Sequence, residues 1–364
     1  MSKLSKYMIA LVTAVALAFS MTACTFGTPD TVGTIGETEI PSGLYLLLQF
    51  QSFNGAAGYA SADQKKMTVS KFLNETITVK DDANLDDGDY LVSDYVAKKT
   101  MILLEYYAAV EQQFAAYEGE LEASTVAYNE SYAEYIMTYQ KDLYLANGFA
   151  EPTLLRYLNN QAKAYELLKL KYGKDGSDAL KQSEVDAYVA SDVYFGQYFS
   201  VALSASGKTY SDKVIDAMTD LAKEAAKAAD EGKSMDEVAT EYLPKLYEAA
   251  EAKYDEETDK KLNSTLYTKN DLTDSYGENV AKSFSECKVG STIAVRMGAN
   301  LYVFQRQSLE GNKEYDEDYL WDLAVEDLMN EDLQAWLFQL GAEYPHNLDA
   351  AAMKQMPAKK IRTE

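Results

Sequence analysis

The sequence has 364 residues, of which 58 are acidic and 34 basic, and its formal net charge at pH 7 is −24. A surface this acidic repels nucleic acid and anionic lipid headgroups, so nucleic-acid-binding classes are excluded. The length is sufficient for two domains. The 29 tyrosines combine a large apolar face with a polar tip, which suits helix packing or an adaptable peptide-binding surface.

The first 23 residues have the pattern of a bacterial lipoprotein signal peptide. Lys3 and Lys6 supply a short positive region, and residues 8–19 are almost purely apolar. This apolar stretch is well short of the roughly 20 residues that span a bilayer. Residues 21–24 resemble a lipobox, so we expect cleavage before Cys24 and a lipid on its thiol, which would anchor the chain at the extracytoplasmic face of the bacterial cell membrane. An ordinary secretory signal with an incidental cysteine is the alternative.

The first half of the mature chain is predicted to be mainly helical. After a linker at residues 24–30, residues 31–40 indicate a short strand or hairpin, and Pro41 begins a helix. Residues 54–90 show no regular pattern. Three further helices are predicted from apolar side chains at intervals of three and four, with glycines at their ends: residues 91–117, 122–147 and 152–172. We expect these helices to pack as one helical domain over residues 31–190.

The pattern changes near Asp192, where residues 193–203 become aromatic and β-branched and predict a strand. Helices are expected from Ser211 and from the capping box that starts at Ser234. Further strands are predicted at residues 265–267, 292–296 and 301–305. These elements indicate a small α/β unit over residues 191–310.

The C-terminal part is predicted to be one helix followed by a tail. Residues 315–340 are apolar on nearly all sides, which is typical of a buried helix, so residues 311–345 are expected to return to the helical domain. Residues 346–364 are expected to be an extended tail with a mobile basic end.

Several short motifs have a common order. Residues 32–40 run as strand, glycine and helix start, and residues 147–154 form an Asn-Gly helix junction that ends in Thr-Leu. Residues 183–188 are a short acidic helix before the first strand of the α/β unit. Lys-Val-Gly at residues 288–290 comes before the last strand at residues 301–304. In order and spacing these motifs resemble the PrsA/SurA family of extracytoplasmic foldases.

The resemblance implies an α+β fold that is mainly α. A helical chaperone domain would be formed by the N-terminal region and the C-terminal helix, with a parvulin-type peptidyl-prolyl isomerase domain inserted between them. It also implies a foldase or chaperone function, with unfolded or nascent secreted polypeptides as partners, bound without ATP. The membrane would be reached through the lipid on Cys24. No cofactor and no nucleic-acid partner are expected.

The sequence departs from the family pattern at the positions where active parvulins have their isomerase site. Active parvulins carry histidines on the first and last strands, and the matching positions here hold Tyr198 and Tyr302. The family's glycine-rich segment is replaced by residues 263–267. Because tyrosine does not titrate near neutrality, we expect isomerase activity to be weak or lost, and we assign no catalytic residue. The alternative function is a surface binding or scaffolding lipoprotein with a non-catalytic parvulin-like module.

Other kinds of site find little support in the sequence. His346 is the only histidine, so neither a catalytic triad nor a zinc site of the usual kind is expected. Once Cys24 carries the lipid, Cys287 has no disulfide partner and is expected to be a small buried hydrophobe. The acidic run that includes Asp82 resembles a calcium loop, but its glycine is one place late and a closing glutamate is missing. A solvated turn is the favoured interpretation, and calcium binding is left open.

Overall fold

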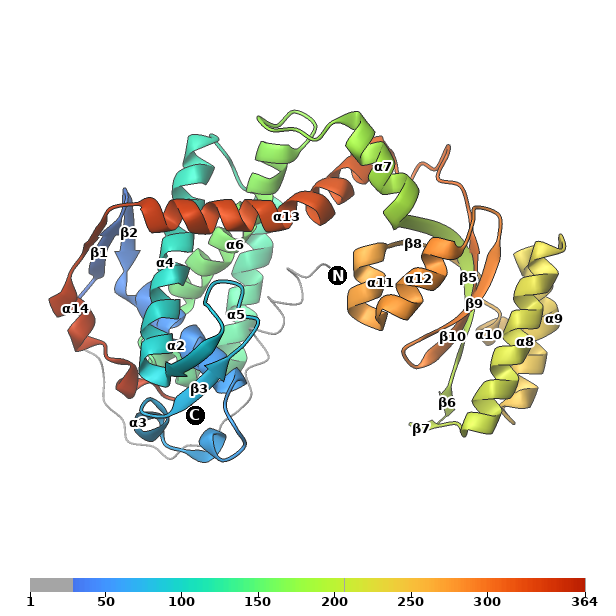
Figure 1. Cartoon of the computed structure of the whole chain (residues 1–364), viewed down its shortest axis with the longest axis horizontal. Helices are drawn as coiled ribbons and strands as arrows, with labels where there is room; N and C mark the ends of the chain where they lie inside the picture. The colour runs from blue at the N-terminus through green and yellow to red at the C-terminus, as the bar shows by residue number, and fades with distance from the viewer. Residues whose placement is uncertain (1–28, 206, 364) are drawn as a thin grey trace. The chain divides into compact units, whose positions relative to one another are not determined.

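The computed structural model describes residues 29–205 and 207–363. The fold is α+β and mainly α, with small antiparallel sheets, as the sequence predicts (Figure 1). The chain forms two compact units. We call residues 180–327 the sheet unit, and residues 29–179 together with 328–363 the helical unit.

Four long helices build the helical unit: α2 (Ser42–Gly58), α4 (Val92–Ala116), α5 (Ala123–Ala146) and α6 (Glu151–Tyr172). Pro41 has extended backbone geometry at the start of α2, which suits a residue that has no N–H to donate. Helix α2 packs against α4, and α6 packs against both α4 and α5. Leu44, Phe53 and Leu104 lie fully buried in the resulting core. The four helices confirm the prediction from apolar spacing.

The segment between α2 and α4 is more ordered than its irregular sequence indicates. It contains η1 (Gln64–Lys66), α3 (Val69–Phe72) and a hairpin of β3 (Thr76–Val79) with β4 (Gly88–Leu91). Alternate residues of β3 are buried and exposed, which is the pattern of a strand with one face on the core. The alternation is too short to be visible beside the acidic run that follows it.

The C-terminal segment is folded, so the prediction of an extended tail is wrong. Strand β11 (His346–Leu348) pairs with β1 (Thr31–Ile35), which also pairs with β2 (Thr38–Pro41). Helix α14 (Ala350–Gln355) and η2 (Ala358–Lys360) follow. Met356 and Ile361 are buried in the core of the helical unit. These apolar side chains are too widely spaced in the sequence to predict an element.

The sheet unit contains a four-stranded antiparallel sheet in the order β8-β5-β10-β9. The bounds of its strands are β5 (Val193–Ala202), β8 (Asn263–Thr268), β9 (Thr292–Met297) and β10 (Asn300–Arg306). All four match predicted strands. Short elements also occur: β6 (Ser204–Ala205), β7 (Lys208–Thr209) and α10 (Glu256–Asp259).

Helices cover both faces of this sheet (Figure 1). One face carries α8 (Asp212–Asp230) and α9 (Met235–Ala249), which were predicted. The capping box of α9 is confirmed, because the Ser234 hydroxyl accepts a hydrogen bond from the Glu237 amide. The other face carries α11 (Lys269–Tyr276) and α12 (Glu278–Glu286), which were not predicted.

Helix α7 (Gln182–Asp192) leads into β5, and α13 (Glu317–Glu343) follows the sheet. The boundary between the two units falls within α13, after Asp327. Within the sheet unit, the Tyr188 hydroxyl of α7 donates a hydrogen bond of 2.6 Å to the Asp327 carboxylate. Further along α13 Leu337 is buried but Leu328 is 41% exposed, so this helix is not buried on all sides as the sequence suggested.

No helix in the described part of the chain is long and apolar enough to cross a membrane. Cys24 and the predicted signal peptide lie outside the described residues, so lipid attachment stays a prediction.

Candidate functional site

Tyr198 and Tyr302, the two residues at the family's histidine positions, lie on the same face of the sheet because side chains alternate between the faces along a strand. On β5, Phe199 points into the core with α8 and α9, so Tyr198 beside it points to the face that carries α11 and α12. Tyr302 of the neighbouring strand β10 points to the same face. The two ring centroids are 5.2 Å apart, with an angle of 46° between the ring planes. The structure therefore makes a contact pair of two positions that are 104 residues apart in the sequence.

Two more tyrosines join this pair. Tyr267 of β8 lies on the same face, and Tyr276 at the end of α11 is close enough to interact electrostatically with both Tyr267 and Tyr302. We call Tyr198, Tyr267, Tyr276 and Tyr302 the tyrosine cluster. Tyr276 is 40% exposed and the other three are half-buried, so the cluster is accessible from solvent. Sequence analysis did not identify Tyr267 and Tyr276, since their positions depend on the strand order and on a helix that was not predicted.

A layer of buried rings supports the tyrosine cluster. Phe284 of α12 and Phe304 of β10 are fully buried, with their ring centroids 4.8 Å apart. Tyr267 lies against both, at 5.4 Å from Phe284 and 6.2 Å from Phe304. Gly196 makes room for this layer, because a Cβ atom there would lie 2.5 Å from the Phe304 ring. The cluster is therefore held on a rigid base.

Arg306 at the end of β10 links the start of β5 to the segment that follows α12. Its guanidinium donates hydrogen bonds to the Cys287 carbonyl at 2.9 Å and to the Val193 carbonyl at 3.1 Å. It also lies 4.9 Å from the centroid of the Tyr194 ring, in a cation–π contact. Arginine suits this position, because its planar group can bond in several directions and stack at the same time. A single arginine at a strand end gives no sequence signal for this role.

The electrostatics of the cluster keep the hydroxyls of Tyr267 and Tyr302 protonated. Burial raises the pKa of Tyr267, and the neighbouring Tyr302 and Tyr198 raise it further. Burial likewise raises the pKa of Tyr302, with added contributions from Tyr276 and Tyr198. These shifts move both groups further from neutrality than ordinary tyrosine, whose pKa is about 10. The two phenols can thus donate hydrogen bonds to a peptide carbonyl, but they are poorly suited to proton transfer at pH 7.

The two other candidate residues, His346 and Cys287, do not belong to the tyrosine cluster. His346 is in the helical unit, on β11, with its Nε2 atom 3.4 Å from the Glu105 carboxylate. Cys287 is buried, as predicted, and its Sγ lies 3.4 Å from the Ser291 carbonyl. Burial raises the pKa of the Cys287 thiol, which lowers its reactivity at neutral pH.

Asp82 in the acidic run is engaged by protein groups, so the interpretation of a solvated turn is wrong for this residue. Its carboxylate lies 2.6 Å from the Lys99 ammonium and accepts a hydrogen bond from the Tyr95 hydroxyl. Burial acts to raise the pKa of Asp82, but the bonds from Lys99 and from the Asn84 amide outweigh it, and the pKa lies below its ordinary value. Residues 29–205 and 207–363 contain no cluster of three histidine, cysteine or acidic groups able to hold a metal ion.

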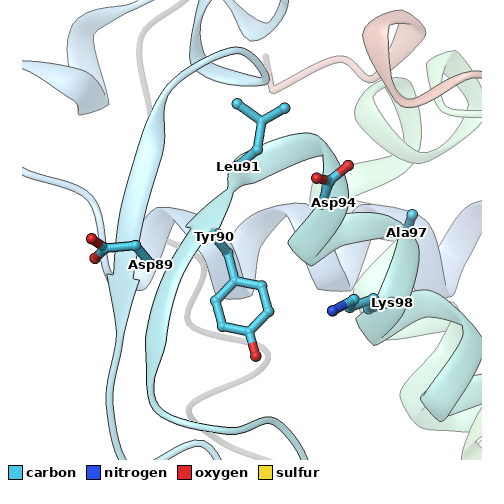
Figure 2. A pocket seen from close by; sticks show the side chains of 6 residues that line it. All are labelled: Asp89, Tyr90, Leu91, Asp94, Ala97 and Lys98. Carbon is cyan, nitrogen blue, oxygen red and sulfur yellow. The ribbon is translucent and has the colours of Figure 1, made fainter.

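A shallow surface depression of about 340 Å³ lies where β4 meets the start of α4 (Figure 2). The lining residues, all labelled in Figure 2, are Asp89, Tyr90, Leu91, Asp94, Ala97 and Lys98. The Lys98 ammonium lies 5.1 Å from the centroid of the Tyr90 ring. The lining has two carboxylates and one ammonium group, and the ammonium group already interacts with the Tyr90 ring. The depression therefore indicates no particular ligand.

No protein-family model and no curated protein match this sequence. Among solved structures, the chain is similar to the foldase protein PrsA from Streptococcus pneumoniae, with 12% identity, a TM-score of 0.36, and coverage of 77% of this chain and 98% of that one. PrsA from Bacillus subtilis gives 12% identity, a TM-score of 0.32, and coverage of 78% and 98%. The foldase protein PrsA from Lactococcus lactis has 10% identity and a TM-score of 0.34, with coverage of 74% of this chain and 90% of that one. TM-scores below 0.5 do not establish a common fold, and they do not transfer an activity to this chain.

Proposed function

We propose that this chain is a membrane-tethered extracytoplasmic foldase or chaperone that binds unfolded secreted polypeptides without ATP. The tyrosine cluster is the observation that carries the proposal. Its half-buried rings offer apolar contact area, and the hydroxyls of Tyr267 and Tyr302 offer hydrogen-bond donors for a peptide backbone. Such a surface binds peptide segments through features that many sequences share, which is what a general chaperone requires.

The order of sequence motifs supports the same proposal. The segments that resemble the PrsA/SurA family come before and within a sheet unit whose sequence is enclosed by the two parts of the helical unit. The proposed domain bounds follow the sequence prediction: a helical domain at residues 31–190, a parvulin-like domain at residues 191–310 and a returning helix at residues 311–345.

We infer that prolyl isomerase activity is weak or lost. Uncatalysed rotation about a peptide bond has a barrier of about 18–20 kcal/mol, which an isomerase lowers without a covalent step. Where active parvulins have two histidines, this chain has Tyr198 and Tyr302 in mutual ring contact. A refolding reaction limited by a prolyl bond tests the inference, with no acceleration over the uncatalysed rate expected. A rate increase of tenfold or more at substoichiometric protein would overturn it.

The proposed location depends on Cys24. A lipid there would keep the protein at the extracytoplasmic face of the membrane, while the acidic surface would hold its folded part away from anionic headgroups. Cys24→Ala should release the protein from the membrane fraction. If the variant stays in that fraction after a high-salt wash, lipid attachment at Cys24 is not the anchor.

An aggregation assay tests the binding function. We expect residues 25–364, which include every described residue, to slow light scattering by a chemically unfolded client in the absence of ATP. Replacing Tyr198 and Tyr302 with serine should reduce this protection, and Tyr319→Ser, an exposed ring elsewhere in the sheet unit, should not. If the wild-type protein leaves aggregation unchanged and instead binds one folded partner, the chain is a scaffolding lipoprotein.

A further inference from the structure

Helix α5 carries a second tyrosine surface, in the helical unit. Its inner side buries Ala133, Ile136 and Met137. A different side carries a row of tyrosines at intervals of four, three and four residues, which places them along one stripe of the helix. We call this row the tyrosine ladder: Tyr128, Tyr132, Tyr135 and Tyr139.

The rings of the ladder contact one another in sequence. The centroids of Tyr128 and Tyr132 are 6.1 Å apart, those of Tyr132 and Tyr135 are 6.3 Å apart, and both pairs are nearly parallel. Tyr135 and Tyr139 are closer, at 5.0 Å. The rings therefore already lie side by side without a ligand, and such an arrangement reduces the entropy cost of binding.

The ladder is unusually exposed for aromatic side chains. Tyr128, Tyr135 and Tyr139 are 68%, 59% and 70% exposed. Tyr132 is partly buried against the core of the helical unit, which fixes the middle of the row. Single exposed aromatic residues need no explanation, but a contiguous row of them is typical of a binding surface.

The charges along the same stretch favour a cationic partner. Residues 117–151 contain seven acidic side chains and one lysine. The acidic residues are Glu118, Glu120, Glu122, Glu130, Glu134, Asp142 and Glu151, and the lysine is Lys141. Arginine and lysine also interact favourably with the faces of tyrosine rings. Charge and ring chemistry therefore point to the same ligand class.

The spacing of the rings favours an extended peptide backbone. Tyr139 is eleven positions after Tyr128, a length of about 16 Å at 1.5 Å per residue, which equals about five residues of extended chain. Side chains on one face of an extended chain recur every two residues, at about 6.6 Å. Two of the three ring separations, 6.1 and 6.3 Å, are close to this repeat, and the third, between Tyr135 and Tyr139, is shorter at 5.0 Å. A polyproline helix repeats every three residues, at about 9.3 Å, and does not match them.

We propose that the tyrosine ladder binds an extended, cationic polypeptide segment of about five residues with arginine or lysine at alternate positions. Its side chains lie along the exposed rings. Asp142 lies one helical turn after Tyr139 at the end of the ladder, and the excess negative charge of residues 117–151 attracts the segment. The proposal rests on the proposed function only in that such segments occur in unfolded chains, and it assigns them a surface separate from the tyrosine cluster.

Fluorescence anisotropy with a labelled peptide Gly-Arg-Ser-Arg-Ser-Arg-Gly tests the proposal on residues 25–364. We expect this peptide to bind, and the matched peptides with glutamate or serine in place of arginine to bind at least about tenfold more weakly. The triple variant Tyr128→Ser, Tyr135→Ser, Tyr139→Ser should weaken binding by tenfold or more. Because the replaced side chains are exposed, the variant should keep the wild-type circular dichroism spectrum.

Two control variants sharpen the result. Phenylalanine at the same three positions should keep most of the affinity, since the ring faces carry the contact. Tyr165→Ser removes an exposed tyrosine of α6 and should leave binding unchanged. Unchanged affinity in the serine variant, or equal binding of all three peptides, would overturn the proposal. A ladder-dependent dimer in sedimentation without peptide binding would also overturn it, because a second copy would then be the occupant.

The aggregation assay with a client that has no closely spaced arginines or lysines separates this proposal from the proposed function. If the client is protected while the arginine peptide does not bind, the ladder proposal fails and the chaperone proposal stands. If the arginine peptide binds but no unfolded client is protected, the chaperone proposal fails.

Discussion

The folded C-terminal segment gives the sharpest prediction about stability. Met356 follows α14 and is fully buried in the core of the helical unit. Its carbonyl also accepts a hydrogen bond from the buried Gln49 side chain at 3.3 Å. Met356→Ala keeps this backbone contact and removes only the buried side chain, so any loss of stability reports on packing.

The size of the loss follows from burial. Burying a methionine side chain contributes about 1.5–3 kcal/mol, and the cavity left by truncation raises the measured cost of a buried Met→Ala change to about 2–5 kcal/mol. We expect about 3 kcal/mol for Met356→Ala, because no part of this side chain is exposed. With a urea dependence of about 1–3 kcal/mol per M, the unfolding midpoint of the helical unit should fall by roughly 1–3 M.

Urea unfolding of residues 25–364, followed by circular dichroism, measures the change. Met353→Ala is the matched control, since it makes the same replacement three residues earlier, within α14, at a half-buried position and should cost clearly less. Lys354→Ala is exposed and should change the free energy of unfolding by no more than about 0.5 kcal/mol. If Met356→Ala unfolds at the same urea concentration as Lys354→Ala, the C-terminal segment does not pack as described.

Three further changes test other contacts. Lys99→Met leaves the Asp82 carboxylate buried without its cation, so it should lower the free energy of unfolding by about 3 kcal/mol at pH 7. At pH 4 the loss should be smaller, because protonation of Asp82 removes the buried charge. An equal loss at both pH values in urea unfolding contradicts this. In the wild type the pKa of Asp82 is lowered, so its contribution is present above the ordinary aspartate pKa and is lost as pH falls through the folded value. Asn147→Ala removes the side chain that bonds both the amide and the carbonyl of Arg362. It should lower the free energy of unfolding by about 1–3 kcal/mol and speed hydrogen exchange at the C-terminus. Unchanged exchange at the C-terminus counts against this contact. Arg306→Met should lower the thermal midpoint of the sheet unit more than Arg306→Lys does, and calorimetry that finds the reverse order refutes the bonding assigned to the guanidinium.

The long helices and the sheet strands could be predicted from the sequence because their signals are local. Apolar side chains recur along α4, α5 and α6, and the aromatic, β-branched run of β5 extends over ten residues. The missed helices α11 and α12 have fewer buried side chains, which include Leu272 and Phe284. In so short a helix, a few buried side chains decide the structure. The sequence alone does not show which residues of the sheet they pack against.

The candidate site was predictable only in part for a similar reason. Tyr198 and Tyr302 could be assigned to the first and last strands from sequence order alone. Their ring contact with each other, and the neighbouring Tyr267, depend on which strands pair and in which register. The role of Arg306 depends on three segments meeting at one guanidinium, which is a property of the folded chain.

Hydrogen exchange with a permanently unfolded client tests the central claim most directly. The claim is that unfolded polypeptide binds at the tyrosine cluster of the sheet unit. It predicts slower exchange in β5, β8 and β10 when the client is added to residues 25–364, and no such change in the variant with serine at positions 198 and 302. Exchange in these strands that is unaffected by the client, or that slows equally in the variant, would contradict the account.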